Sequence, residues 1–370
     1  MQYIETIKKS FLFFPLIALL ITIPFITSNY HKYGSIHKLR VFIIYSFVLY
    51  LLTIYFLVIL PLPSIEEVRN LTTPTMNLIP FSFVVDFIKE SPFIITEPST
   101  YLLALKHSSF YVVIFNIFMT IPFGMYLKYY YKCSFKKTLL ISFLLSLFFE
   151  LTQLSGLYFI YPRAYRLFDV DDLILNTTGG IIGFGLMSII DKYLPSRDKI
   201  DNESREQGRI VSPLRKLTIT FLDLFLYLIL LTILTLTIGN RHTIIVSFIL
   251  YYLIIPLILN GATLASKFLN VKKSFNKHPL INTIIHPLFK VFYYFILPYL
   301  PLAFIFYLNN LFNNLFIKII LTFSGVAIIP LFYLVNLIVL FKRKNMFYNK
   351  YFNLEYKSTI KINDENIDQQ

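Results

Sequence analysis

The stretch "LFFELTQLSGLYFIYPRAYRLFDVDDLILNTTGG", residues 147–180, joins two apolar segments that are each long enough to enter a membrane. Polar residues lie at or inside the ends of both segments, namely Glu150, Gln153, Asp172 and Asn176. Hydrocarbon is a poor solvent for a carboxylate, so side chains at this depth need partners. Two questions follow: which segments of the chain span the membrane, and which role these polar side chains have at that depth.

The composition predicts an all-α, polytopic membrane protein. Of 370 residues, 56% are hydrophobic and only 15% are charged, and the mean hydropathy is +0.66. Several stretches exceed the ~18 apolar residues that indicate a membrane helix. We predict about nine spans in two bundles, at residues 11–27, 41–62, 109–127, 138–157, 173–190, 217–238, 244–260, 291–308 and 319–341.

The distribution of charge predicts the orientation. The net charge is +14, which in a soluble protein would suggest nucleic acid. Here the positive-inside rule explains it, and we expect no nucleic-acid partner. The segments 28–40, 128–137, 191–216, 261–290 and 342–370 hold 25 Lys and Arg residues, and the alternate segments hold nine. We therefore expect a cytoplasmic C-terminus, with loops 63–108 and 158–172 outside the cell membrane.

The N-terminal residues and the single cysteine limit the alternatives. Lys8 and Lys9 lie on the side predicted to be outside, which is the weak point of this orientation. The first segment has a signal-like charge order but no small-x-small cleavage site, so we expect a retained span. Cys133 is the only cysteine, which excludes an internal disulfide framework and a cysteine metal site.

Residues 191–216 divide the chain. They are charged, polar and without apolar periodicity, as in a cytoplasmic linker. We predict a membrane domain of five spans at 1–190, this linker, and a membrane domain of four spans at 217–341. The basic and polar tail at 342–370 is expected to be partly disordered.

The predicted orientation places one set of polar side chains in an outer layer of the membrane. With a rise of ~1.5 Å per residue, several of them lie about 10 Å or less below the outer surface. Glu150 would be partnered by Arg166 or by a carboxamide, and Asp172 would lie near the N-cap of its helix. The alternative is that the amides only join helices. The predicted cluster comprises Asn116, Glu150, Gln153, Arg163, Arg166, Asp169, Asp172 and Asn176.

Two glycines lie deeper on the same helix. Gly179 and Gly183 have the spacing that lets the backbones of two membrane helices approach closely. They predict a tightly packed group of three helices under the polar layer.

Four ordered motifs resemble the VanZ-like family over roughly residues 40–190. They are "NLIPF" at 77–81, Asn116 with "IPFG" at 121–124, Glu150-x-x-Gln153, and "RLFDVDDLILNTTGG" at 166–180. The resemblance implies a bacterial cell-envelope protein, in a family whose named member is linked to low-level resistance to teicoplanin-type glycopeptides. One departure is the outer loop "YFIYPRAY", which is longer and more aromatic than the family pattern.

The second half resembles the RDD family more faintly. Arg215 and Asp223 in "RKLTITFLDLFLYLIL", and the amphipathic "GATLASKFLNVK" at 261–272, carry this resemblance. Ala265-Ser266 replaces the glycine expected in that pattern, and the usual alanine after the arginine is missing. Asp223 would then be a membrane acid near Arg215, and the alternative is a local ion pair at the interface.

Three classes of function remain open. The first is recognition of an amphiphile at the outer leaflet, either a membrane lipid, a lipid-linked cell-wall precursor or a lipoglycopeptide, with Arg163 and Arg166 available for phosphate. The second is an enzyme acting on such a molecule. No cofactor is evident, although Asp169, Asp172 and Glu150 offer oxygen ligands for a divalent cation. The third is a proton-coupled transporter or flippase, which no inverted repeat supports. We favour recognition, with a role in glycopeptide tolerance.

Overall fold

The chain is helical over most of its length. The computed structural model describes residues 2–239, 242–311, 314–343 and 345–360. Within these residues, eight helices are long and apolar enough to cross a membrane: Ile4–Tyr33, Lys38–Ile59, Ser108–Tyr129, Phe135–Leu154, Val170–Tyr193, Pro213–Ile238, Pro279–Asn309 and Leu315–Lys342. The predicted class, an all-α multi-pass membrane protein, is confirmed.

One of the about nine predicted spans is a shorter helical run than the other eight. The segment expected at 244–260 is a helical run of only 16 residues, Thr243–Ile258. It consists of α12 (Thr243–Phe248), the π-helical η3 (Ile249–Ile254) and α13 (Ile255–Ile258). The run turns back along α11 (Pro213–Ile238), since the Tyr251 hydroxyl donates to Asp223 at 2.9 Å. The apolar residues of this stretch give no sign that six of them, Ile249–Ile254, form a π-helical turn.

The chain folds into two units. The first contains residues 1–21 and 38–200, and the second contains residues 22–37 and 201–370. The division therefore falls inside the predicted linker, where α10 (Arg197–Gln207) forms a polar helix. Residues 22–37 join the second unit because Tyr30 packs there against Val211, Ile219 and Leu269.

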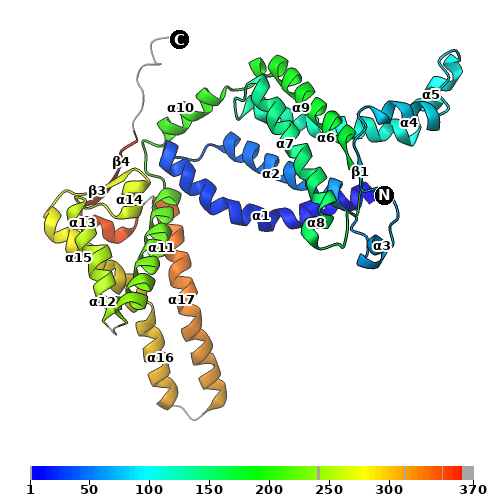
Figure 1. Cartoon of the computed structure of the whole chain (residues 1–370). Coiled ribbons are helices and arrows are strands. Elements are labelled where there is room, and N and C mark those ends of the chain that lie inside the picture. The colour runs from blue at the N-terminus through cyan, green and yellow to red at the C-terminus, as the bar shows by residue number, and fades with distance from the viewer. Residues whose placement is uncertain (1, 240–241, 312–313, 344, 361–370) are drawn as a thin grey trace, which may run out of the picture. The chain divides into compact units, whose positions relative to one another are not determined.

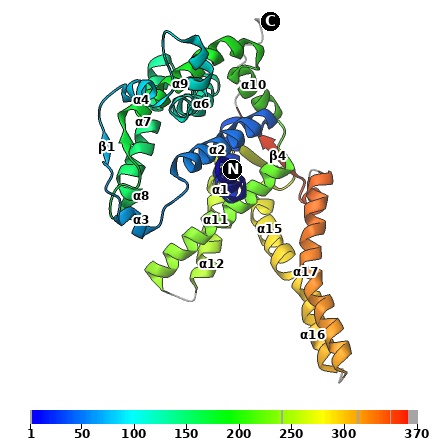
Figure 2. The same ribbon diagram turned by 90° about the vertical axis from the view of Figure 1, so that its right-hand side faces the viewer.

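The first unit has a core of three membrane helices. These are α6 (Ser108–Tyr129), α7 (Phe135–Leu154) and α9 (Val170–Ile190), which lie side by side in Figures 1 and 2. The other elements are α1 (Gln2–Tyr33, shared with the second unit), α2 (Lys38–Ile59), α3 (Ile65–Arg69), β1 (Met76–Asn77), α4 (Ser82–Glu90), η1 (Pro98–Thr100), α5 (Tyr101–Leu105), α8 (Gly156–Phe159), β2 (Phe168–Asp169) and η2 (Asp191–Tyr193). β1 and β2 pair in parallel.

The helices of this core are held close by glycines of α9. A Cβ atom placed on Gly179 would lie 2.2 Å from the Ile117 carbonyl oxygen, and one on Gly183 would lie 2.0 Å from that of Ile121. Gly124 of α6 and Gly180 of α9 approach as closely, since a Cβ on Gly124 would lie 1.8 Å from the Gly180 oxygen. Only glycine fits at these positions, so the polar layer lies above a tightly packed helix pair.

The second unit combines apolar helices with a small antiparallel sheet. Besides α11 to α13 it contains α14 (Leu264–Phe268), β3 (Val271–Phe275), α15 (Pro279–Val291), the π-helical η4 (Phe292–Ile296), α16 (Tyr299–Leu311), α17 (Leu315–Arg343), η5 (Phe347–Lys350) and β4 (Leu354–Ser358). α16 and α17 form a long antiparallel pair (Figure 2). β4 pairs with β3, so residues 354–358 of the tail, for which partial disorder was expected, form a strand. Residues 361–370 lie outside the described residues.

Candidate functional site

Asp171, in the first turn of α9, links the N-terminal end of this helix to α4. Its carboxylate accepts hydrogen bonds from the Phe81 amide at 2.5 Å, the Ser82 hydroxyl at 2.7 Å and the Phe83 amide at 2.9 Å. The side chain is 3% exposed. These donors form the N-terminus of α4, where free amides and the helix dipole favour a negative charge. Asp171 thus caps a helix that lies 90 residues earlier in the chain.

Asp171 was not among the residues predicted for the site. A signal was nevertheless present, because the residue before α4 is Phe81, which has no side-chain oxygen to cap the helix. Such a helix needs an external acceptor. The polar residues Asn77 and Ser82 beside it also take part, since the Asn77 amide nitrogen donates to the Ser82 hydroxyl at 2.8 Å.

Asp169 is the N-cap of α9. Its side chain accepts from the Asp171 amide at 2.9 Å, and both of its carboxylate oxygens lie 3.3 Å from the Asn77 amide nitrogen. The predicted start of this helix near Asp172 was therefore late by a few residues, because Asp169 provides the cap instead. The pairing of β1 with β2 sets Asn77 opposite Asp169 and brings the "NLIPF" segment to the site.

Glu150 finds its partner in the backbone. Its carboxylate accepts from the Asp169 amide at 2.9 Å, and the side chain is 2% exposed. Arg166 donates to the carbonyl oxygens of Val58 at 2.6 Å and Leu60 at 3.0 Å, and it forms no ion pair with Glu150 in the described part of the chain. Neither partner expected for Glu150, Arg166 or a carboxamide, is the one that binds it.

Gln153 and the two arginines fix the loop that follows α2. The Gln153 amide donates to the same Val58 carbonyl at 3.0 Å. Arg163 donates to the carbonyl of Leu71 and, at 2.5 Å, to that of Thr73. The terminal nitrogens of both arginines are thus engaged with backbone oxygens. Their expected use as phosphate ligands would require these bonds to be exchanged.

A second level of hydrogen bonds joins the three core helices. Asn116 of α6 donates to the carboxylate of Asp172 on α9. Asn176 of α9 donates to the Ser146 hydroxyl of α7 at 3.0 Å, and the Thr120 hydroxyl of α6 donates to the Asn176 carbonyl at 2.8 Å. Of the predicted residues, Asn116, Asp172 and Asn176 are therefore joined through this level, together with Ser146 and Thr120. Glu150 binds Asp169, whereas Gln153, Arg163 and Arg166 bind backbone carbonyls at the end of α2 and in the segment after it.

An apolar cavity adjoins this network. It has a volume of about 370 Å³ and lies among α4, α5 and the outer part of α6. Its lining comprises Phe83, Val84, Phe87, Phe93, Tyr101, Ala104, Leu105, Ser109, Phe110 and Val113. Phe83, whose amide is bound by Asp171, is a wall of the cavity, so the polar network positions the apolar site.

The two candidates in the second unit do not meet. Arg215 is fully buried and donates to the carbonyls of Gly34, Gly208, Leu269 and Asn270 and to the Ser358 hydroxyl, at 2.7–3.2 Å. Asp223 accepts instead from the hydroxyls of Tyr251 and Thr263. The alternative of a local Arg215–Asp223 ion pair is therefore wrong. Arg215 ties together four segments that we predict to be cytoplasmic.

The carboxylates of this site are already engaged by protein donors. Among the described residues, no group of three or more His, Cys, Asp or Glu side chains is placed to hold a metal ion. Asp169, Asp171 and Glu150 direct their oxygens at backbone amides, which are donors that a bound cation would have to displace. A divalent cation at Asp169, Asp172 and Glu150 stays a prediction without support from this geometry.

Helices and network together define a multi-pass membrane protein with a polar site at one end of a three-helix core. The model of the VanZ/LLP1 family matches residues 47–191, which include α6, α7, α9 and the whole polar network. The VanZ-like part of the predicted resemblance is thus confirmed over these residues, whereas the RDD-like part stays a prediction. No curated protein and no solved structure matches the chain.

Proposed function

We propose that the first unit binds an amphiphile at the outer leaflet of the membrane. The apolar cavity carries this proposal, because ligand sites commonly have 300–1,000 Å³ of apolar volume with a few placed polar groups. Phe83, Phe87 and Phe110 offer aromatic surface for an acyl chain or other apolar tail. Asp171 holds α4, and with it this wall of the cavity.

The head group of the amphiphile would meet the partly exposed carboxylates. Asp169 and Asp172 are neither fully buried nor saturated with donors, so they can accept from hydroxyl or amine groups of a glycan or peptide. Lipid-linked cell-wall precursors and lipoglycopeptides combine such head groups with apolar tails. The VanZ family is linked to glycopeptide resistance, which supports a role in tolerance of teicoplanin-type antibiotics.

A pair of neighbouring valines provides the test. Val113 lines the cavity, whereas Val112 is 58% exposed on the adjacent face of α6. In cells that depend on this protein for glycopeptide tolerance, Val113→Trp should abolish tolerance and Val112→Trp should preserve it at equal membrane expression. Equal tolerance in both variants would refute the cavity as the binding site. Mass spectra of lipid-linked precursors would reveal chemical modification, and thereby distinguish binding from catalysis.

A proton-coupled carrier is the second candidate, and one observation favours it. Thr138, Ser142, Ser146 and Glu150 recur every four residues on α7, and all are at most 2% exposed. The hydroxyls of Thr138 and Ser142 have no hydrogen-bond partner among the described residues. Buried hydroxyls of this kind are commonly satisfied by water, which could relay protons to Glu150. Proton uptake by proteoliposomes, abolished by Glu150→Gln, would test this candidate.

A further inference from the structure

The inner face of the β3–β4 sheet in the second unit carries an unusual charge. Alternate residues of β3 point inward, and Lys273 lies between Val271 and Phe275, which are 2% and 9% exposed. Lys273 pairs with Tyr356 of β4, so both side chains lie on this inner face. A lysine is therefore held where a core residue would be expected.

Two more lysines approach from neighbouring helices. The ammonium of Lys216, in the first turn of α11, lies 4.6 Å from the centre of the Tyr356 ring. Lys290 follows Thr283 and His286, which are 7% and 3% exposed, on the buried face of α15. Lys290 and Lys273 are close enough to repel each other electrostatically. Figure 1 shows β3, β4 and the start of α11 at the same end of this unit.

One carboxylate faces these lysines. Asp223 is 6% exposed, lies within electrostatic range of Lys273 and Lys290, and accepts from Tyr251 and Thr263 at 2.9 Å. Glu355 lies on the outer face of the sheet, where it pairs with Lys357 at 3.4 Å. Among the described residues, Lys273 and Lys290 thus share this single acid, which leaves an excess of positive charge on the inner face.

The excess charge of Lys273 and Lys290 is not neutralised by an ion pair within 4 Å in the part of the chain that the structure describes. Burial lowers the pKa of Lys273, because the loss of water outweighs the electrostatic attraction of Asp223. Unpaired charges in such a place are unfavourable unless a ligand neutralises them. Basic pockets between membrane helices at the predicted cytoplasmic side typically accept anionic head groups.

We propose that Lys216, Lys273 and Lys290 form a binding site for a phosphate group, within the second unit and separate from the proposed amphiphile site of the first. Two sources share this chemistry, the head group of an anionic phospholipid and a soluble phosphate. Tyr356 forms one wall of the site, and Asp223 partly offsets the positive charge of the lysines. The Tyr251 hydroxyl holds Asp223, and the π-helical turn of η3 places that tyrosine.

Adjacent lysines of β3 provide a matched pair of variants. Lys273 points inward and Lys272, its exposed neighbour, points outward opposite Lys357. The full chain is reconstituted in nanodiscs of neutral lipid, and thermal unfolding is followed with inorganic phosphate or with added phosphatidylglycerol. Phosphate or the anionic lipid should raise the Tm of wild type and of Lys272→Met. Lys273→Met should weaken this response by roughly tenfold in concentration or more.

Further outcomes of this experiment distinguish a lipid head group from a soluble phosphate and can contradict the proposal. A response to phosphatidylglycerol alone identifies a lipid head group, and a response to inorganic phosphate identifies a soluble ligand. Without ligand, Lys273→Met should keep or raise the Tm because it removes like-charge repulsion. Lys290→Met removes the same repulsion, so it too should keep or raise the Tm without ligand. Asp223→Asn should strengthen binding by removing a negative charge. Absence of any response in wild type, or equal responses in Lys272→Met and Lys273→Met, would overturn the proposal.

Discussion

The carboxylate of Asp171 lies 2.5 Å from the backbone amide of Phe81, ninety residues earlier in the chain. This contact joins the first turn of a membrane helix to the first turn of α4 outside it. Through α4 it also fixes the aromatic wall of the apolar cavity. The polar residues at the outer end of the core thus have a structural task, which any ligand-binding role must accommodate.

Replacement of Asp171 should release α4. Asp171→Asn leaves the first amides of α4 without a charged acceptor, which should lower the free energy of unfolding by roughly 1–3 kcal/mol. Limited proteolysis should then cut between residues 78 and 107 faster than in wild type. Asp86→Asn changes an exposed carboxylate on α4 itself and should leave the cleavage rate unchanged. Equal protection of all three proteins would show that the cap does not hold this segment.

Two glycines of α9 should respond in opposite directions to the same change. A Cβ atom at Gly183 would collide with the Ile121 carbonyl, whereas Gly185 has no atom within 4 Å of that position. Gly183→Ala should therefore destabilise the protein by about 1–3 kcal/mol through overpacking. Gly185→Ala should stabilise it by about 0.5–1 kcal/mol through helix propensity. Thermal unfolding in detergent measures both, and a harmless Gly183→Ala would contradict the close approach of α6 and α9.

The partners of Arg166 can be ranked by double-mutant cycles. Arg166 and Gln153 share the Val58 carbonyl, whereas Glu150 bonds to the Asp169 amide. Gln153→Ala and Arg166→Ala should therefore be coupled by about 0.5 kcal/mol or more, and Glu150→Ala and Arg166→Ala by less. The free energies of unfolding of the single and double variants give the coupling energy of each pair. A larger coupling for the Glu150 cycle would indicate an ion pair that the structure does not contain.

The depth of the polar layer could be predicted from the sequence, but its partners could not. Helical rise places Glu150, Asn116 and Asp172 at one level, since each depth needs only the ends of a span. The partner of Glu150 depends on where the extended residues before α9 run, and those are positioned by the pairing of β1 with β2. A contact set by two short strands leaves no periodic trace in the sequence.

The strand β4 shows a signal that was available and missed. Leu354 and Tyr356 alternate with Glu355 and Lys357, the period-2 pattern of a half-buried strand. The basic composition of the tail favoured disorder instead. The amino-acid composition describes the tail as a whole and therefore hides a five-residue strand within it. The alternation of apolar and charged residues in that strand determines which side chains reach the inner face of the sheet.

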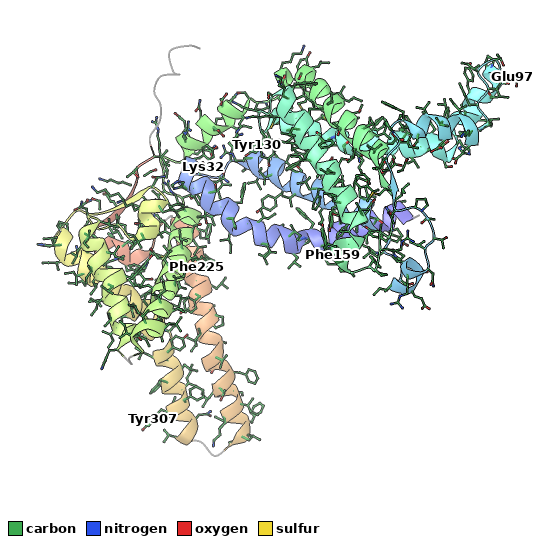
Figure 3. The ribbon with its side chains drawn as sticks, viewed as in Figure 1. Lys32, Glu97, Tyr130, Phe159, Phe225 and Tyr307 are labelled. Carbon is green, nitrogen blue, oxygen red and sulfur yellow. The ribbon has the colours of Figure 1, made fainter. Side chains whose placement is uncertain are left out.

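The turn after α7 stores backbone strain that a single substitution should relieve. Gly156, Leu157, Tyr158 and Phe159 all have positive φ, between 55° and 70°, and Phe159 is 88% exposed at the turn where Figure 3 labels it. Left-handed backbone costs roughly 1–2 kcal/mol for a residue with a Cβ atom. Phe159→Gly removes this free-energy cost and loses little buried surface, so the Tm should rise. Ile160→Gly, at a φ of −69°, should lower the Tm because glycine there only adds freedom to the unfolded chain. If both variants lower the Tm, the Phe159 ring contributes more by its contacts with surrounding lipid than its backbone loses by strain.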